Sequence, residues 1–278
     1  MVKKNENQMD LFVANLIDVA PKGDQTSMEV PIFSLKKNKD IDQFIWNGKN
    51  GAKVIVTPNQ YGRATMWDKD ILIYLFGQVA AQINRGGEPQ RTIHATAHDI
   101  LMSTGRDVGG KGYKELESAL RRLQGTTIET NIKTEGLKSK RAFSIIQDWG
   151  TIEKHENGNM IAVEITLSEW LYQAVTNLDV LTYDRKYYRL SSGMEKRLYE
   201  IFRKHCGNQT SWLIGEEALF KKSGSRGNIR DFRRFLKDRD KEKLRKDESI
   251  FLGKILGYRY EYDSSNKKIM VFKSRSLT

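Results

Sequence analysis

The stretch AHDILMSTGRDVGGKGYKELESALRRLQG, at residues 97–125, decides the fold. Thr96 is a suitable N-cap for a short helix that begins at residue 97 and stops before Gly105. A second helix is predicted over Tyr113–Gln124, because leucines recur there at positions i, i+4 and i+7. A short helix, a glycine-rich turn and an amphipathic helix follow one another in a helix-turn-helix. We therefore expect this motif here.

Strand-like segments surround this motif. TTIETNI (126–132) and RAFSIIQDWG (141–150) are joined by the basic segment KTEGLKSK, so we expect them to form the hairpin, or wing, of a winged helix. A third strand, MIAVEITL (160–167), follows the turn HENGN. The elements expected upstream are strands at 28–35 and 52–58 and a helix over Trp67–Asn84.

The same order of elements recurs in the last third of the chain. A helix over Ser192–Lys204 precedes the strand-like SWLI, a short helix over Glu216–Lys222, the turn SGSRGN and a helix from Ile229. YRYEYD and KIMVFKSR then form a hairpin around SSNK. We predict an α+β protein made of two tandem winged-helix domains with a flexible N-terminal arm. The expected ranges are 1–27 for the arm, 28–167 for the first domain, 168–180 for a linker with a helix, and 181–278 for the second domain.

Charge is distributed unevenly along the 278 residues. The net charge is +12, yet residues 1–181 hold 22 basic and 22 acidic side chains, whereas residues 182–278 hold 25 basic and 13 acidic ones. Such a one-sided basic segment favours nucleic acid as a partner over a merely solvated surface. The single cysteine excludes a disulfide scaffold, and no apolar run approaches the roughly 18 residues of a membrane span. With no signal-like apolar segment behind the first lysines, we expect a cytoplasmic protein.

DNA contacts are expected from the second helix of each helix-turn-helix and from each wing, because these elements meet base edges and phosphates. In the first domain the candidates are Lys111, Tyr113, Lys114, Arg121 and Arg122 on the helix and Lys133, Lys138, Lys140 and Arg141 on the wing. In the second domain they are Lys221, Lys222, Arg226, Arg230, Arg233, Arg234 and Lys237 around the helix, and Lys267, Lys268, Lys273 and Arg275 on the wing. The first domain could instead serve as a dimerisation unit.

No catalytic or metal-binding constellation is found in the sequence. Gly105–Gly112 fits GxxxxGK, but Gly112 stands where a phosphate-binding loop needs Ser or Thr, and a helix pattern precedes it instead of a strand. His94 and His98 have no third ligand, so they do not make a convincing metal site. We expect a protein that is not an enzyme and carries no cofactor or metal.

The N-terminal segment QMDLF, residues 8–12, resembles the bacterial sliding-clamp binding motif. In such a segment Leu11 and Phe12 would enter an apolar groove, while Gln8 forms a hydrogen bond at its rim. Docking of the segment on the protein's own surface is the alternative.

Several segments together resemble the bacterial plasmid replication initiator protein A family. They are MEVPIFSLKK (28–37), TMWDKDILIYLFGQ (65–78), residues 92–124 and LTYDRKYYRLSSGMEKRLYEIFRKH (181–205). The resemblance implies a sequence-specific DNA-binding initiator that binds repeated sites in a plasmid origin, promotes opening of an A·T-rich segment and recruits host replication proteins. It also implies a sliding clamp, replicative helicase or host initiator as partners, and a homodimer.

Two other functions remain open at this point. A transcriptional repressor could have the same fold without initiator activity. A nicking enzyme could use Tyr183, Tyr187 or Tyr188 as its nucleophile, although the His-x-His pair that would hold its metal is missing from the sequence.

Overall fold

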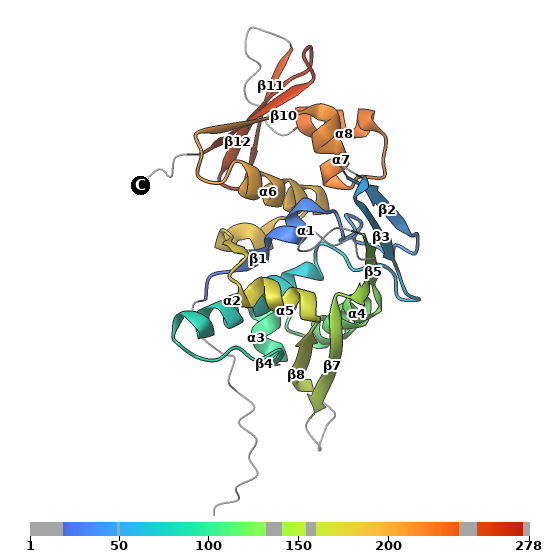
Figure 1. The fold of residues 1–278 in the computed structure, drawn as a ribbon, viewed down its shortest axis with the longest axis vertical. Coiled ribbons are helices and arrows are strands. Elements are labelled where there is room, and N and C mark those ends of the chain that lie inside the picture. The colour runs from blue at the N-terminus through green and yellow to red at the C-terminus, as the bar shows by residue number, and fades with distance from the viewer. Residues whose placement is uncertain (1–18, 49–50, 132–140, 154–159, 239–248, 275–278) are drawn as a thin grey trace, which may run out of the picture.

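The computed structural model describes residues 19–48, 51–131, 141–153, 160–238 and 249–274 (Figure 1). Helices and strands are mixed along the whole chain, which confirms the predicted α+β class. Two units share one order of elements, and each has a helix-turn-helix beside a small antiparallel sheet.

The winged helix of the first unit consists of six elements. Its three strands pair in the order β4-β8-β7, as in a winged helix. Helix α2 begins it, and α3 and α4 form the predicted helix-turn-helix. The three helices place their apolar faces in one core. The elements are α2 (Lys69–Asn84), β4 (Thr92–Thr96), α3 (Ala97–Ser103), α4 (Gly110–Gly125), β7 (Ile146–Glu153) and β8 (Met160–Leu167).

A second sheet is inserted into this unit, and it corrects the predicted wing. Strands β2 (Phe44–Asn47), β3 (Lys53–Thr57), β5 (Thr127–Thr130) and β6 (Arg141–Ser144) pair in the order β2-β3-β5-β6. The hairpin of β5 and β6 is therefore not the wing. Strands β7 and β8 occupy that position instead.

The prediction of one strand over 141–150 was wrong, because this segment forms two strands, β6 and β7, in different sheets. Ile145 and Ile146 are both buried, at 1% and 0% exposure. A regular strand points consecutive side chains to opposite faces, so it cannot bury both in one core. The chain bends at Ile145, where β6 ends in one sheet and β7 begins in another.

The second unit repeats the winged-helix plan. Helix α6 is closed at its N-terminus by a capping box of Ser192 and Glu195, and α7 and α8 form the helix-turn-helix. Strand β11, which was not predicted, extends the sheet to the order β10-β13-β12-β11. The elements are α6 (Gly193–His205), β10 (Ser211–Gly215), α7 (Glu216–Ser223), α8 (Ile229–Lys237), β11 (Ile250–Ile255), β12 (Tyr258–Asp263) and β13 (Lys268–Lys273).

Short elements join the two units. Strand β1 (Lys22–Asp24) pairs with β9 (Val180–Thr182), and α1 (Gln25–Glu29) contacts α6. Helix α5 (Glu169–Thr176), capped by Ser168, confirms the helix expected in the linker, and the 3-10 helix η2 (Arg185–Arg189) precedes α6.

Two predictions at the N-terminal side are corrected by these joining elements. Residues 22–27, expected within a flexible arm, are folded into β1 and α1. The strand expected over 28–35 is absent there. Helix α1 ends at Glu29, and the following residues are extended with only the isolated bridge between Ser34 and Thr65. The apolar side chains of this stretch are buried in the two cores, although residues 30–35 form no regular strand.

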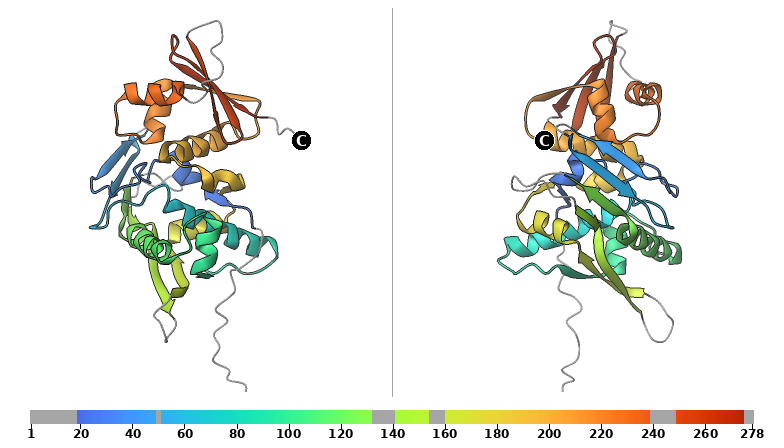
Figure 2. Two further views of the ribbon diagram at one scale, coloured as in Figure 1. Left: turned by 180° about the vertical axis from the view of Figure 1, so that it is seen from behind. Right: turned by 45° about the vertical axis from the view of Figure 1, so that its right-hand side comes forward.

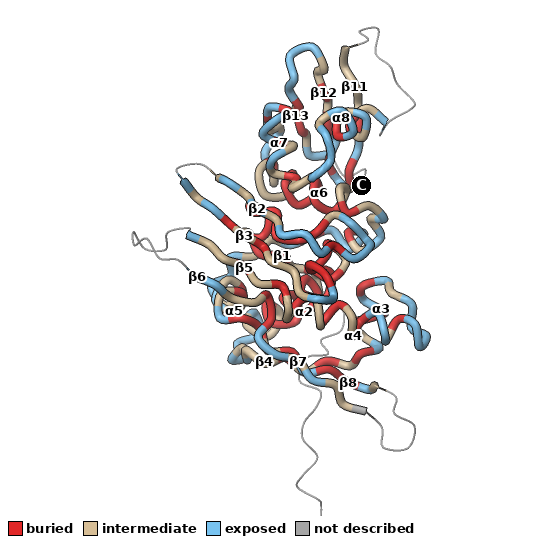
Figure 3. Tube along the Cα trace, turned by 90° about the vertical axis from the view of Figure 1, so that its right-hand side faces the viewer, coloured by how far each residue is buried: buried red, intermediate tan, exposed pale blue. Residues whose placement is uncertain are grey.

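Two hydrophobic cores meet at the boundary of the units. Met28 and Ile73 come from the N-terminal part of the chain, yet they belong to the core of the second unit. Figure 3 shows buried positions in α2 and in α6, on either side of this boundary. Within the described ranges, no helix has the length and apolar composition needed to cross a membrane.

Candidate nucleic-acid interface

The helix-turn-helix of the first unit depends on close packing of its turn, residues 104–109. Thr96 caps α3 by accepting a hydrogen bond from the Asp99 amide at 3.1 Å, and Gly105 has φ +67°. A Cβ atom on Gly112 would lie 1.6 Å from the Asp107 carbonyl oxygen, so only glycine allows α4 to begin this close to the turn. The glycine run thus serves a tight turn before a helix.

Some of the predicted DNA-contact residues on helix α4 are exposed to solvent, and others make contacts within the protein. Lys111 and Lys114 are exposed, whereas Tyr113 packs against the core. Arg121 contacts Glu117 and lies over the Trp149 ring. Arg122 donates two hydrogen bonds, at 2.7 and 2.8 Å, to the carboxylate of Asp68, which is 1% exposed.

The helix-turn-helix of the second unit divides its basic residues in the same way. The second turn, residues 224–228, begins with Gly224, whose φ of +71° and closeness to Pro31 both require glycine. In helix α8, Arg230 and Arg234 are exposed, and Arg234 pairs with Asp231 on the surface at 2.9 Å.

Other predicted arginines and lysines of the second unit are held by intramolecular contacts. Arg233 binds the carboxylate of buried Glu216 at 2.7–3.0 Å. Lys222 contacts Glu29, and the ammonium of Lys237 lies 4.3 Å from the centre of the Phe251 ring. Lys221 is exposed.

Arg226 is bound to the loop that precedes β2. Its guanidinium donates to the Asp42 and Gln43 carbonyls at 2.9 and 2.8 Å, and to the carboxylates of Asp40 and Asp42 at 3.1 and 3.2 Å. This arginine therefore joins the second turn to the first unit.

The wing of the second unit, the β12–β13 turn, carries Lys267 and Lys268 in exposed positions, and Lys273 on β13 donates to Asn208. Arg141 lies on β6, outside the wing of the first unit. Seven of the predicted contact residues lie outside the described part of the chain: Gln8, Leu11, Phe12, Lys133, Lys138, Lys140 and Arg275.

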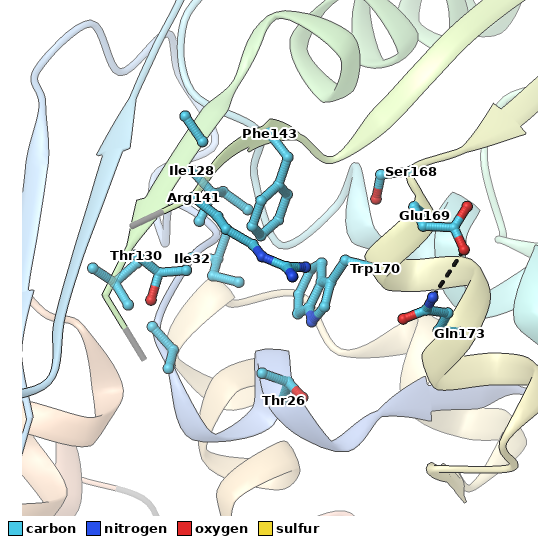
Figure 4. A pocket seen from close by; sticks show the side chains of 13 residues that line it. Thr26, Ile32, Ile128, Thr130, Arg141, Phe143, Ser168, Glu169, Trp170 and Gln173 are labelled. Atoms are coloured by element: carbon cyan, nitrogen blue, oxygen red, sulfur yellow. Dashed lines mark hydrogen bonds between the residues drawn. The ribbon is translucent and has the colours of Figure 1, made fainter. Parts of the chain in front are cut away.

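Arg141 borders a cavity of about 510 Å³ between β5, β6, α1 and α5. In Figure 4 its side chain reaches toward the indole of Trp170, which packs against Phe143 with ring centres 5.2 Å apart. At the polar end, Gln173 donates to Glu169 at 2.9 Å. The lining is largely apolar, which suits an apolar group more than a phosphate.

Buried charges fix the two helix-turn-helix motifs relative to each other. Lys196 on α6 donates to both carboxylate oxygens of Asp70 on α2 at 2.9 Å, and Lys69 pairs with Glu200 at 2.7 Å. Burial raises the pKa of Asp70 to about 6, against the opposite effect of Lys196. None of the four side chains is more than 4% exposed, and separating the units would break both of these ion pairs.

The groups that could support catalysis are buried or isolated. Tyr183 and Tyr187 are 3% and 0% exposed, and burial raises the pKa of each phenol well above its usual value. The thiol of Cys206 is buried, and its pKa is raised by desolvation. Over the described ranges, no three His, Cys, Asp or Glu side chains come together in a metal-binding group.

Sequence reasoning missed Arg106, and it assigned Arg226 to DNA without showing its contacts to the first unit. Arg106, in the first turn, donates to the Trp67 carbonyl at 2.6 Å, as Arg226 does to Asp42 in the second. Both arginines stand three to four residues before the helix that follows the turn. An alignment of the two halves by the order of their elements would have shown from the sequence that Arg106 and Arg226 occupy equivalent positions.

Comparison with known proteins gives the family. The sequence matches the family described as Replication initiator protein A over residues 22–243. A protein of Wigglesworthia glossinidia brevipalpis, named "Putative replication protein", is 36% identical over 241 residues, which cover 85% of this chain and 86% of that protein.

Solved structures with the same fold include domains 2 and 3 of RctB. A selenomethionine derivative of these domains superimposes with a TM-score of 0.65 over 91% of this chain and 99% of that one, at 13% identity. A second structure of RctB domains 2–3 gives a TM-score of 0.56 over 88% and 95% of the two chains, also at 13% identity. The fold agreement spans both winged-helix units, and the family match covers both helix-turn-helix motifs; the chain belongs to the replication initiator protein A family.

Proposed function

We propose that this protein is a non-enzymatic plasmid replication initiator that binds repeated sites in origin DNA, promotes opening of the origin and recruits host replication proteins. The observation that carries the proposal is the placement of α4 and α8. Figure 1 shows both helices on the same side of the molecule, one in each unit, and Figure 3 shows them one above the other from a direction 90° away.

Each of these helices can enter a major groove with its first turns toward the base edges. The candidates for these contacts are the exposed basic residues. They are Lys111 and Lys114 on α4 and Arg230 and Arg234 on α8. Two of them, Lys111 and Arg234, form surface ion pairs with Glu115 and Asp231. Arginine donates two hydrogen bonds to guanine, so α8 carries more of the sequence preference.

Two recognition helices in one rigid molecule would bind two half-sites at a fixed separation. In dimeric helix-turn-helix proteins this separation is one helical turn of DNA, about 34–36 Å. The buried pairs between α2 and α6 supply the rigidity. The wing lysines Lys267 and Lys268 add contacts to phosphates.

Recruitment is assigned to the N-terminal segment QMDLF, with Gln8, Leu11 and Phe12 binding a sliding clamp. Deleting residues 8–12 should abolish plasmid replication and leave operator-type DNA binding unchanged. Replication that survives the deletion would remove the segment from the proposal, and replication that survives loss of the whole protein would favour a repressor.

Footprinting on the origin repeats with a salt titration tests the DNA-binding part. Affinity should fall by about 0.9 log units per log unit of salt for each phosphate neutralised. Binding that is insensitive to salt, or that shows no preference over random DNA, would contradict the proposal.

A further inference from the structure

A basic segment without an assigned role, Lys36–Lys39, lies between the two helix-turn-helix motifs. We propose that Lys36, Lys37 and Lys39 contact the DNA phosphates between the two half-sites, so that the protein has a third, sequence-independent contact zone. This inference rests on the proposed function, because it needs DNA to lie across both motifs.

The first turn is joined directly to this region. The Arg106 guanidinium donates to the Trp67 carbonyl at 2.6 Å, and the ammonium of Lys37 lies 5.8 Å from the centre of the Trp67 ring. The segment therefore starts beside the turn that precedes α4.

The second turn reaches the other end of the same segment. Arg226 donates to the Asp40 carboxylate and to the carbonyls of Asp42 and Gln43, within 3.1 Å in each case. Lys36–Lys39 is thus held between an arginine of the first turn and an arginine of the second.

The backbone under the segment is fixed by a short ladder to residues 63–66. Ser34 and Ala64, Met66 and Ser34, and Arg63 and Asp40 are joined by backbone hydrogen bonds of 2.8–2.9 Å. The three lysines themselves are exposed, and Lys36 reaches only 3.8 Å from Asp40. A rigid backbone with ammonium groups that reach solvent suits a polyanion whose charges are regularly spaced.

Acidic neighbours do not cancel these charges. Asp40 is 2% exposed and is already bound by Arg63, Arg226 and the Ser34 hydroxyl. Asp42 is exposed but paired with Arg226. The segment therefore presents an excess of positive charge toward solvent.

The test is a salt titration on origin DNA that holds both half-sites, with the full-length protein and the variant K36Q/K37Q/K39Q. Removing three phosphate contacts should make the slope of log affinity against log salt shallower by about 2.7. Base preference at the half-sites should stay the same, because phosphates carry no sequence information.

The matched control is R85Q/R185Q/K186Q, which removes the same charge at exposed positions. These residues lie at the end of α2 and in η2, which Figure 2 also shows on the far side of the molecule from α4 and α8. The control should keep the wild-type slope within about one unit, and thermal unfolding should show both triple variants folded.

The outcomes separate the two proposals. If the wild type has no preference for origin DNA, the proposed function fails. If the wild type binds the origin but K36Q/K37Q/K39Q keeps the wild-type salt slope, the proposed function stands and the contact zone is refuted. The same conclusion follows if the slope of the control variant falls as much as that of K36Q/K37Q/K39Q. Protection of the DNA between the half-sites that disappears only in K36Q/K37Q/K39Q would support it independently.

Discussion

The ammonium of Lys69 on α2 lies 2.7 Å from the carboxylate of Glu200 on α6, and both side chains are completely buried. The Tyr187 hydroxyl donates to the same carboxylate oxygen at 3.0 Å. A buried pair of this kind adds little net stability relative to an apolar contact, but it permits only one arrangement of its partners. In this protein that arrangement is the orientation of one winged-helix unit against the other.

Replacing only one partner of the pair should be costly. Lys69→Met removes the ammonium at Glu200 Oε1, and the buried carboxylate then keeps as its cation the Arg197 guanidinium, at the longer distance of 3.4 Å. We therefore expect a loss of about 3 kcal/mol in the free energy of unfolding, at the lower end of the range for a broken buried pair. Lys69→Met combined with Glu200→Gln should recover much of this loss. Urea unfolding of the single and double variants measures both values.

An exposed pair provides the control for that prediction. Arg91 and Glu169 are 3.1 Å apart with side chains 34% and 59% exposed, so Glu169→Gln, which keeps the hydrogen bond from Arg91 to the Leu167 carbonyl, should cost less than about 1 kcal/mol. An equal loss for Lys69→Met and Glu169→Gln would contradict a special role for the buried pair.

Acid should weaken the protein through Glu29. The close approach of His205 and Lys222 holds the pKa of Glu29 well below its ordinary value, against the effect of burial. A carboxyl with a lowered pKa in the folded state stabilises the protein above its unfolded pKa, and this contribution is lost as pH falls below about 4.5.

Glu29→Gln should therefore be less stable than the wild type at pH 7 and approach it in acid. Thermal unfolding from pH 7 to pH 3 measures the difference. A constant gap between the two proteins over that range would show that the ionised carboxylate does not contribute.

Arg226 and Arg230 were both predicted to contact DNA, and the structure gives them different surroundings. Arg226→Ala leaves the buried Asp40 with fewer donors and should reduce the unfolding free energy by about 1–3 kcal/mol. Arg230, exposed in the first turn of α8, should change stability by less than 0.5 kcal/mol on replacement by alanine.

In DNA binding, the variant with the smaller effect on stability should have the larger effect on base preference. Arg230→Ala should relax the preference at one base position by about 1–3 kcal/mol, whereas Arg226→Ala should leave the pattern of preferred bases intact. Competition with singly mutated sites measures the preference. If Arg226→Ala relaxed the base preference, Arg226 would contact DNA bases, as the sequence predicted.

The helices of both units could be predicted from the sequence because local signals determine them. Thr96 caps α3, Ser192 caps α6, and apolar side chains recur at helical spacing in α4. The inserted sheet could not be predicted in this way. Strand β3 pairs with β5 across about 70 residues, and the four residues of β2 are too few to show a period.

The basic character of the candidate interface follows from the sequence, but the pairing of its cations does not. The sequence shows which helices are basic, but it does not show which cations are already paired. Arg233 is bound by Glu216 across 17 residues, and Arg226 by Asp40 across 186. Such pairs depend on tertiary structure, so charge counting assigns to DNA several arginines that the fold also uses.

Helix α4 offers the most direct comparison between a cation held by the fold and a cation proposed to contact DNA. Arg122 donates to the buried Asp68 carboxylate, while Lys114, two turns earlier, is exposed. Arg122→Ala should lower the unfolding free energy by about 2–4 kcal/mol, because Asp68 then stays buried without its partner. Lys114→Ala should leave stability within about 0.5 kcal/mol and make the salt dependence of DNA binding shallower by about 0.9. Urea unfolding and salt titration of both variants decide between the two roles. If Lys114→Ala leaves the salt slope unchanged while Arg122→Ala changes it without loss of stability, the two assignments must be exchanged.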